Sequence, residues 1–232
     1  MRRLLLAVVA LLLLAPVARA AEGDVRLSDE RTLSRYAHAN GLAAVRAHPA
    51  QGAERVDRLR YRTEDGLPEV YLALRGRKAA GAEWVEIRLP GRPNGRKGWV
   101  RRAALGPLRE VTTALVVDRR RFRATLLRDG KRIWRSRVGV GAPGTPTPRG
   151  RFYIRQKLRN LGGNPVYGPW AFGTSAYSVL SDWPGGGVVG IHGTDQPALL
   201  PGRVSHGCVR VPNAAIRRLA RLMPVGTPVR IR

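Results

Sequence analysis

The chain has 232 residues, of which 42 are Lys or Arg and only 16 are Asp or Glu, so its formal net charge is +26 at pH 7. Such a surface favours anionic partners, but the sequence contains no nucleic-acid recognition motif, which argues against a nucleic-acid-binding protein. No segment beyond residue 20 is long and apolar enough to span a membrane. A chain of this length favours two domains.

The first twenty residues have the order of a secretory signal peptide. Met1-Arg2-Arg3 is followed by an apolar run from Leu4 to Leu14 and then by Ala18-Arg19-Ala20. We therefore expect a signal peptide at residues 1–20, cleaved after Ala20, and a mature protein without a transmembrane segment in the periplasm or cell envelope. There the basic surface would meet anionic cell-wall polymers. Biased arginine usage is the alternative explanation of the charge.

Short strands are predicted in the first third of the chain. Residues 59–63 and 70–74 flank a turn-rich segment of hairpin length. In residues 84–89, Val85, Ile87 and Leu89 alternate onto one face, and a Pro- and Gly-rich turn leads to Trp99-Val100. The stretch from Trp84 to Leu105 resembles a bacterial SH3-like domain, which implies a small SH3-like barrel at residues 21–106.

A second domain is predicted after Gly106-Pro107, a plausible linker. Residues 113–117 and 122–127 have strand character, and Asp129-Gly130 is a strong hairpin turn. The next strands are expected near residues 133–134 and 138–140. This domain therefore begins as an antiparallel meander.

The remainder of the chain contains a predicted loop and one predicted helix. Residues 161–187 are rich in Gly, Pro and aromatic side chains without a clear period, which predicts a long functional loop or lid. Asn213 is expected to cap a short helix whose Ile216, Leu219, Ala220 and Met223 share one face. A final strand is predicted at residues 227–231.

The strongest chemical signal is a pair of segments, Ile191-His-Gly-Thr194 and Ser205-His-Gly-Cys-Val-Arg210. Cys208 is the only cysteine, so an internal disulfide is excluded. A thiolate rather than a thiol attacks carbonyl carbon, so Cys208 needs a base, and His192 is the candidate. His192 ends one strand-like segment and Cys208 begins another, and pairing of these strands would bring the two side chains together.

This pattern resembles the signature of the L,D-transpeptidase (YkuD) family over residues 112–232. The resemblance implies a mainly β protein with a YkuD-type β-sandwich and one short helix near the C-terminus. It also implies a thiol-dependent transferase of cell-wall biogenesis that acts on peptidoglycan stem peptides, releases D-alanine and needs no cofactor or metal. Cross-linking, protein anchoring and, with water as acceptor, L,D-carboxypeptidase activity all remain open.

The same resemblance suggests a role for each signature residue. Cys208 is the nucleophile, His192 the general base and acid, and the carbonyl of Gly193 orients the imidazole. The amides of Gly207 and Cys208 are candidates for the oxyanion hole, and His206 is a secondary helper near the thiol. Ser205 and Arg210 complete the signature as candidate substrate-binding residues, although Arg210 equally well braces its loop.

Three other interpretations deserve comparison with this one. A free cysteine is most often a small buried hydrophobe, although the full signature favours catalysis. His192, His206 and Cys208 form a ligand set that zinc accepts, but no acidic partner beyond Asp182 and Asp195 is evident. Finally, a degenerate transpeptidase fold would leave a non-catalytic wall-binding protein.

Overall fold

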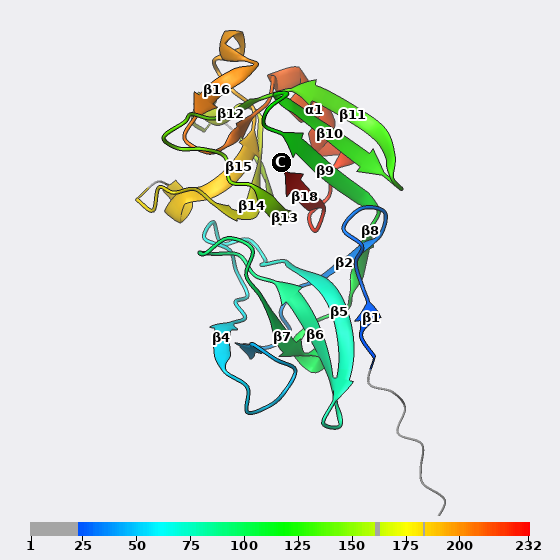
Figure 1. The fold of residues 1–232 in the computed structure, drawn as a ribbon. Helices are drawn as coiled ribbons and strands as arrows, with labels where there is room; N and C mark the ends of the chain where they lie inside the picture. The colour runs from blue at the N-terminus through cyan, green and yellow to red at the C-terminus, as the bar shows by residue number, and fades with distance from the viewer. Residues whose placement is uncertain (1–22, 161–162, 183) are drawn as a thin grey trace, which may run out of the picture.

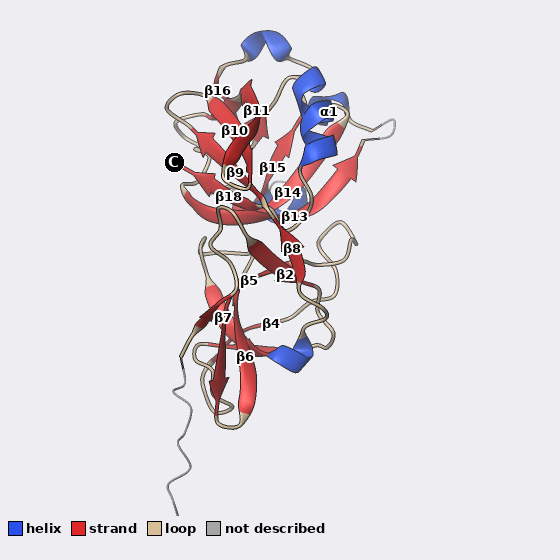
Figure 2. Cartoon of the chain, turned by 90° about the vertical axis from the view of Figure 1, so that its right-hand side faces the viewer, coloured by secondary structure: helices blue, strands red, loops and turns tan. Residues whose placement is uncertain are grey.

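The computed structural model of the chain describes residues 23–160, 163–182 and 184–232 and shows two β units stacked end to end (Figure 1). The predicted signal peptide at residues 1–20 lies outside the described residues, as do Leu161 and Trp183 of the predicted lid. Strands dominate both units, and within the described residues there is one α-helix, near the C-terminus, as predicted (Figure 2). No described helix has the length and hydropathy needed to cross a bilayer.

The N-terminal unit is a strongly bent sheet around its own apolar core. Its strands run in the order β4-β3-β7-β6-β5-β2-β8, with β1 paired to β5. Val85, Ile87 and Leu89 all lie in this core, which confirms the predicted alternation. Whether the unit is an SH3-like domain stays a prediction. The strands are β1 (Val25–Arg26), β2 (Ser34–Ala37), β3 (Ala44–Arg46), β4 (Arg55–Arg58), β5 (Tyr71–Ala79), β6 (Ala82–Arg88), β7 (Lys97–Arg101) and β8 (Arg109–Val111).

The strand predicted at residues 59–63 is wrong. Strand β4 ends at Arg58, and the amide of Arg60 donates to the Tyr71 hydroxyl at 2.7 Å instead of to a neighbouring strand. Only a single bridge, Arg62 to Pro68, remains of the predicted hairpin. The segment is therefore an irregular loop that ends in a turn at residues 63–67. This loop faces the second unit.

The C-terminal unit is a ten-stranded sheet that folds over a core shared with the helix. The strand order is β11-β10-β9-β18-β13-β14-β15-β17-β12-β16. The chain enters it immediately after β8, which still pairs with β2, so the sheets change between Val111 and Thr113. The strands are β9 (Thr113–Asp118), β10 (Arg123–Arg128), β11 (Lys131–Arg137), β12 (Gly139–Gly141), β13 (Gly150–Arg159), β14 (Trp170–Tyr177), β15 (Val188–His192), β16 (Gly202–Ser205), β17 (Val209–Arg210) and β18 (Pro228–Ile231).

The single α-helix, α1 (Asn213–Leu222), packs its predicted apolar face on this core. The expected cap is wrong, however, because the capping position is Pro212 and no side chain caps the helix. The Asn213 side chain is used elsewhere, since its Oδ1 accepts a hydrogen bond from the Thr194 amide at 3.0 Å. Asn213 thus ties the start of the helix to the segment that follows His192.

The long loop predicted at residues 161–187 is wrong in its middle, because Trp170–Tyr177 forms strand β14 between β13 and β15. Most of its side chains are buried, including Phe172 and Ala176 in the core and Tyr177 on the side of the N-terminal unit. A strand buried on both faces has no polar alternation, which explains why periodicity did not reveal it.

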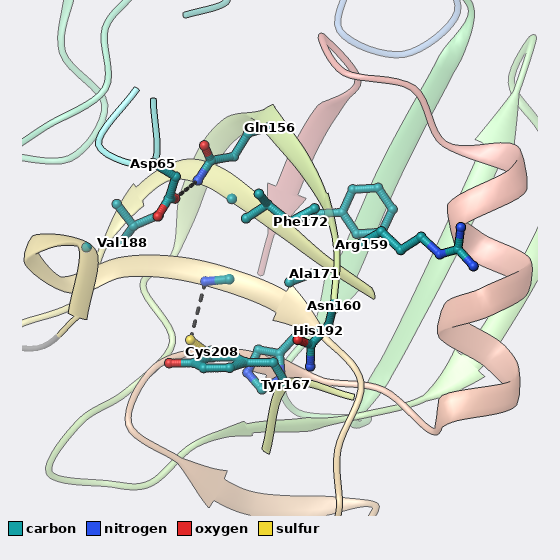
Figure 3. Close-up of a pocket in the computed structure, with 14 residues that line it drawn as sticks. Asp65, Gln156, Arg159, Asn160, Tyr167, Ala171, Phe172, Val188, His192 and Cys208 are labelled. Atoms are coloured by element: carbon teal, nitrogen blue, oxygen red, sulfur yellow. Dashed lines mark hydrogen bonds between the residues drawn. The ribbon is translucent and has the colours of Figure 1, made fainter. Parts of the chain in front are cut away.

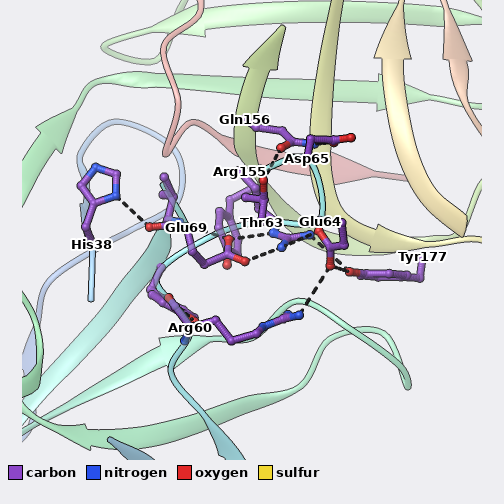
Figure 4. Close-up of polar contacts among 12 residues, drawn as sticks. His38, Arg60, Thr63, Glu64, Asp65, Glu69, Arg155, Gln156 and Tyr177 are labelled. Atoms are coloured by element: carbon purple, nitrogen blue, oxygen red, sulfur yellow. Dashed lines mark hydrogen bonds and ion pairs between the residues drawn. The ribbon is translucent and has the colours of Figure 1, made fainter. Parts of the chain in front are cut away.

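The two units meet at a β-bulge in β13. Ile154 pairs with Thr174 and Gln156 pairs with Gly173, so Arg155 is an extra residue on its strand. A bulge redirects side chains locally, and both Arg155 and Gln156 contact the N-terminal loop of residues 63–69 (Figure 4).

Arg155 makes the central contact of this interface. It is 1% exposed and donates from Nε to Oε1 of the fully buried Glu69 at 2.8 Å. Its Nη2 also donates to Glu69 and lies 3.0 Å from Glu64 Oε2. A buried charge pair that keeps its geometry fixes the position of the elements it joins. The loop of residues 63–69 is therefore held firmly on the C-terminal unit.

Candidate active site

Cys208 and His192 line one cavity of about 420 Å³ in the C-terminal unit (Figure 3). Its wall includes strands β13, β14 and β15, the segment around Tyr167, and Asp65 from the N-terminal unit. Cys208 is half-buried rather than sealed in the core. The lining residues are Asp65, Gln156, Leu158, Arg159, Asn160, Tyr167, Ala171, Phe172, Gly173, Gly185, Val188, Gly190, His192 and Cys208.

The sheet brings the side chains of His192 and Cys208 to the same cavity, as the strand pairing expected from the sequence requires. Strands β15 and β17 pair in parallel, with His192 opposite Arg210, and Cys208 stands directly before β17. A Cβ atom added to Gly190 would lie 3.5 Å from His192 Cδ2 and 3.7 Å from Cys208 Sγ. The Cys208 sulfur and the Cδ2 edge of the His192 imidazole therefore face the same small space beside Gly190.

The imidazole of His192 is held as a neutral base. Its Nδ1 lies 2.6 Å from the carbonyl oxygen of Gly193. Because a carbonyl only accepts, Nδ1 carries the proton and Nε2 has a free lone pair. Burial of this side chain, which is 3% exposed, lowers its pKa to about 4, and the charge of Arg210 acts in the same direction, while the bond to Gly193 opposes them. His192 is therefore neutral at pH 7, with its single ring proton on Nδ1.

The thiol of Cys208 is held mainly in its neutral form. Burial raises its pKa, whereas a hydrogen bond from the Gly190 amide to Sγ at 3.3 Å and the positive charge of Arg210 both act to lower it. Since the imidazole pKa is lowered and the thiol pKa is raised, the resting pair is thiol and imidazole rather than thiolate and imidazolium. The proton moves only when a reaction requires the thiolate.

The loop before Cys208 is braced by its own hydrogen bonds. The buried Ser205 hydroxyl donates to the Cys208 carbonyl at 2.6 Å and accepts from the Gly207 amide at 3.3 Å. Gly207 has φ of +119°, and a Cβ there would lie 2.9 Å from the Ser178 hydroxyl oxygen, so only glycine fits. These contacts favour a bracing role for Ser205 over direct substrate contact. They also occupy the Gly207 amide that the oxyanion hypothesis requires.

The two remaining signature residues lie outside the cavity wall. His206 is exposed, and its carbonyl accepts from the Ser178 hydroxyl at 2.9 Å. Arg210 is half-buried, and its buried Nε has no hydrogen-bond partner within the described part of the chain. Its charge nevertheless acts on the pKa of both His192 and Cys208. No three His, Cys, Asp or Glu side chains of the described ranges come together in a way that would hold a metal ion.

Tyr167 is a site residue that the sequence analysis treated only as part of a lid. Its ring packs edge-on against the His192 imidazole, with ring centroids 5.0 Å apart at 70°. Two glycines make this approach possible, because a Cβ on Gly168 would lie 2.6 Å from the Gly193 Cα, and one on Gly193 would lie 2.9 Å from the Gly168 Cα. The Tyr167-Gly-Pro169 tripeptide is a turn signal, but nothing in its pattern indicates the partner.

The C-terminal unit is similar in sequence to known proteins. The family model for the L,D-transpeptidase catalytic domain, YkuD, matches residues 112–231, which is about half of the chain. The chain belongs to the L,D-transpeptidase (YkuD) family. The matched region includes His192, Cys208 and every other residue of the signature.

Individual curated relatives match part of the chain. The chain is 38% identical to the YkuD protein of Bacillus subtilis and 36% identical to that of Bacillus licheniformis, each over 94 residues. These matches cover 40% of this chain and 50% of either relative, so the chain spans about half the length of the curated relatives it matches. The solved catalytic domain of an Enterococcus faecium L,D-transpeptidase is 29% identical, with 52% of this chain and 96% of that chain covered and a TM-score of 0.42.

Proposed function

We propose that this family member is a peptidoglycan L,D-transpeptidase that uses Cys208 as its nucleophile and His192 as its general base and acid. The observation that supports this most directly is that the two side chains line one cavity and face the same space beside Gly190. The substrate would be a stem tetrapeptide with an L-centre diamino acid at its third position and D-alanine at its fourth.

The chemistry follows from the protonation states. As sulfur attacks the carbonyl carbon of the third residue, His192 Nε2 takes the thiol proton. When the bond to the terminal D-alanine breaks, Nε2 returns that proton to the departing nitrogen, and a thioester remains on Cys208. An amine of a second stem then attacks the thioester, His192 accepts its proton, and sulfur leaves and is reprotonated. The products are a cross-linked dimer and free D-alanine.

The other signature residues support these steps in our proposal. The Gly193 carbonyl fixes the imidazole tautomer, and the Cys208 amide stabilises the developing oxyanion. The Gly207 amide contributes there only if it is released from Ser205. Arg210 lowers the pKa of the thiol and, in this proposal, binds a substrate carboxylate. His206, at the exposed edge, has a secondary electrostatic role.

A second part of the proposal concerns the cell envelope, where an exported enzyme of this kind would work. The outer face of β9, β10 and β11 has a shallow hollow whose lining is strongly basic. Arginines grouped in this way bind phosphates and carboxylates of polymers. We expect the protein to bind anionic cell-wall polymer, and we expect this binding to weaken as salt is added. The arginines of this hollow are Arg121, Arg123, Arg132, Arg135 and Arg232.

Product analysis tests the enzymatic proposal and separates its variants. The protein is incubated with a defined stem tetrapeptide, and D-alanine, tripeptide and dimer are measured by mass spectrometry. Dimer with D-alanine identifies a transpeptidase, whereas tripeptide without dimer identifies an L,D-carboxypeptidase. If neither product appears above the level of Cys208→Ala, the alternative of a non-catalytic wall-binding protein is favoured.

A further inference from the structure

The wall of the reaction cavity includes a residue from the other structural unit. Asp65 lies in the turn of residues 63–67 of the N-terminal unit, outside the region that matches the family model. Among the described residues that line the cavity it is the only acid, in a chain whose net charge is +26. In Figure 3, Asp65 lies beside Gln156, and Cys208 and Tyr167 lie together on the opposite side of the view.

The Asp65 carboxylate is oriented by Gln156. Gln156 Nε2 donates to Asp65 Oδ2, and the Thr63 hydroxyl donates to Gln156 Oε1 at 2.7 Å. Because a carboxylate only accepts hydrogen bonds, the NH2 group of Gln156 must be the end of the amide that faces Asp65. Gln156 is itself 4% exposed, and it fits over the sheet because Gly173 has no side chain, since a Cβ there would lie 2.6 Å from Gln156 Cγ.

The turn that presents Asp65 is fixed at both ends. The Thr63 amide donates to the Leu67 carbonyl at 2.8 Å, and the Tyr177 hydroxyl donates to Glu64 at 2.7 Å. Arg155 binds Glu69 just beyond the turn (Figure 4). Asp65 is therefore held in place before any ligand arrives, which lowers the entropic cost of binding.

This arrangement leaves Asp65 Oδ1 for a ligand in the cavity. A charged acceptor that is preorganised in a largely apolar wall selects a charged donor, and a peptide that enters the cavity supplies one as a primary ammonium group. Burial raises the pKa of Tyr167, and the charges of Cys208 and Asp65 act in the same direction, so Asp65 acts electrostatically on the ring that packs against His192.

We propose that Asp65 is a substrate-binding residue that recognises a primary ammonium group, so that the N-terminal unit completes the active site and helps to set its specificity. This inference rests on the proposed function. The ammonium group has two possible sources, which are the side chain of the diamino acid in the donor stem and the attacking amine of the acceptor stem before it loses its proton.

The test compares Asp65→Asn with the wild-type enzyme on two matched donors. Asparagine keeps the shape and accepts from Gln156, but it places an NH2 donor where the ammonium would bind. The donors are a stem tetrapeptide with a free side-chain amine and the same peptide with that amine acetylated. The matched control is Glu83→Gln, since Glu83 is an exposed acid whose nearest ion-pair partner, Lys78, is 4.0 Å away.

We expect Asp65→Asn to lose about twofold to fivefold in kcat/KM for the free-amine donor, as for loss of an ion pair at an exposed carboxylate. Release of D-alanine from the acetylated donor should not change, and Glu83→Gln should behave as wild type with both. If instead D-alanine release is unchanged with both donors and the loss appears only in the ratio of dimer to tripeptide, the acceptor is the source of the ammonium group. Either selective loss supports the inference.

Two results would overturn it. Equal losses with both donors, and an unchanged dimer ratio, would mean that Asp65 only supports the fold. No loss in any assay would mean that Asp65 binds nothing. Failure of the proposed function is distinguishable, because the wild-type enzyme would then release no D-alanine from either donor. In that case, calorimetric binding of the two peptides to the wild-type and Asp65→Asn proteins decides the role of Asp65, and equal affinities would refute it.

Discussion

The neutral state of His192 makes a quantitative prediction about pH. With a pKa of about 4, only about 10% of the imidazole is protonated at pH 5, whereas about 97% of an ordinary histidine with pKa 6.5 would be. The acidic limb of kcat/KM for D-alanine release should therefore fall near pH 4 rather than near pH 6.5. Stopped assays between pH 3.5 and pH 8 measure this limb. A midpoint at pH 6 or above would refute the described environment of His192.

The same shift predicts a change in stability. The folded pKa of His192 lies below its unfolded value of 6.5, so the unfolded chain binds more protons between pH 6.5 and pH 4. The stabilisation is complete above pH 6.5 and is lost as pH falls to about 4, and a shift of this size is worth about 3 kcal/mol. Denaturant unfolding of wild type and His192→Gln should show it as a pH-dependent difference. The exposed His48→Gln provides the control, and parallel pH profiles for wild type and His192→Gln would contradict the reasoning.

Three further changes test the surroundings of the site. Glu69→Ala leaves the buried Arg155 with Glu64 as its remaining acidic partner, so the free energy of unfolding should fall by about 3 kcal/mol. The double variant Glu69→Leu with Arg155→Met should recover most of that loss. An unchanged denaturation midpoint in Glu69→Ala would show that the ion pair does not stabilise the fold. Gly193→Ala places a Cβ 2.4 Å from Asn213 Oδ1. The resulting shift should displace the His192 imidazole and lower kcat about tenfold or more. A kcat equal to that of the wild type would contradict this. Arg210→Gln should raise the thiol pKa, because Arg210 lowers it, and should slow iodoacetamide alkylation severalfold at pH 8; faster alkylation would reverse the sign of the proposed effect.

The sequence was most informative where chemistry and local pattern coincide. His192 and Cys208 were predicted as a pair because both adjoin strand-like segments, and the parallel pairing of β15 with β17 confirms that placement. The apolar face of α1 was predicted because an amphipathic helix has a strong period. Strand β14 was missed because both of its faces are buried, which removes the alternation on which strand prediction depends.

The parts of the site that could not be predicted depend on contacts between distant segments. Asp65 and Gln156 are 91 positions apart, and they meet because a bulge at Arg155 turns two consecutive side chains toward the same loop. Asn213 looked like a helix cap, because asparagine commonly caps helices, but its side chain bonds to Thr194 instead. Contacts of this kind depend on tertiary packing, so they cannot be predicted from local sequence propensity.

The central claim is that Cys208 is acylated by a stem peptide with the help of His192. Intact-protein mass spectrometry tests it most directly, after the enzyme is mixed with tetrapeptide and quenched in acid. The account predicts an added mass equal to the tripeptide acyl group, located on Cys208 by peptide mapping, absent in Cys208→Ala and formed at least about a hundredfold more slowly in His192→Gln. D-alanine release that persists in Cys208→Ala, without any adduct on the wild-type protein, would contradict it.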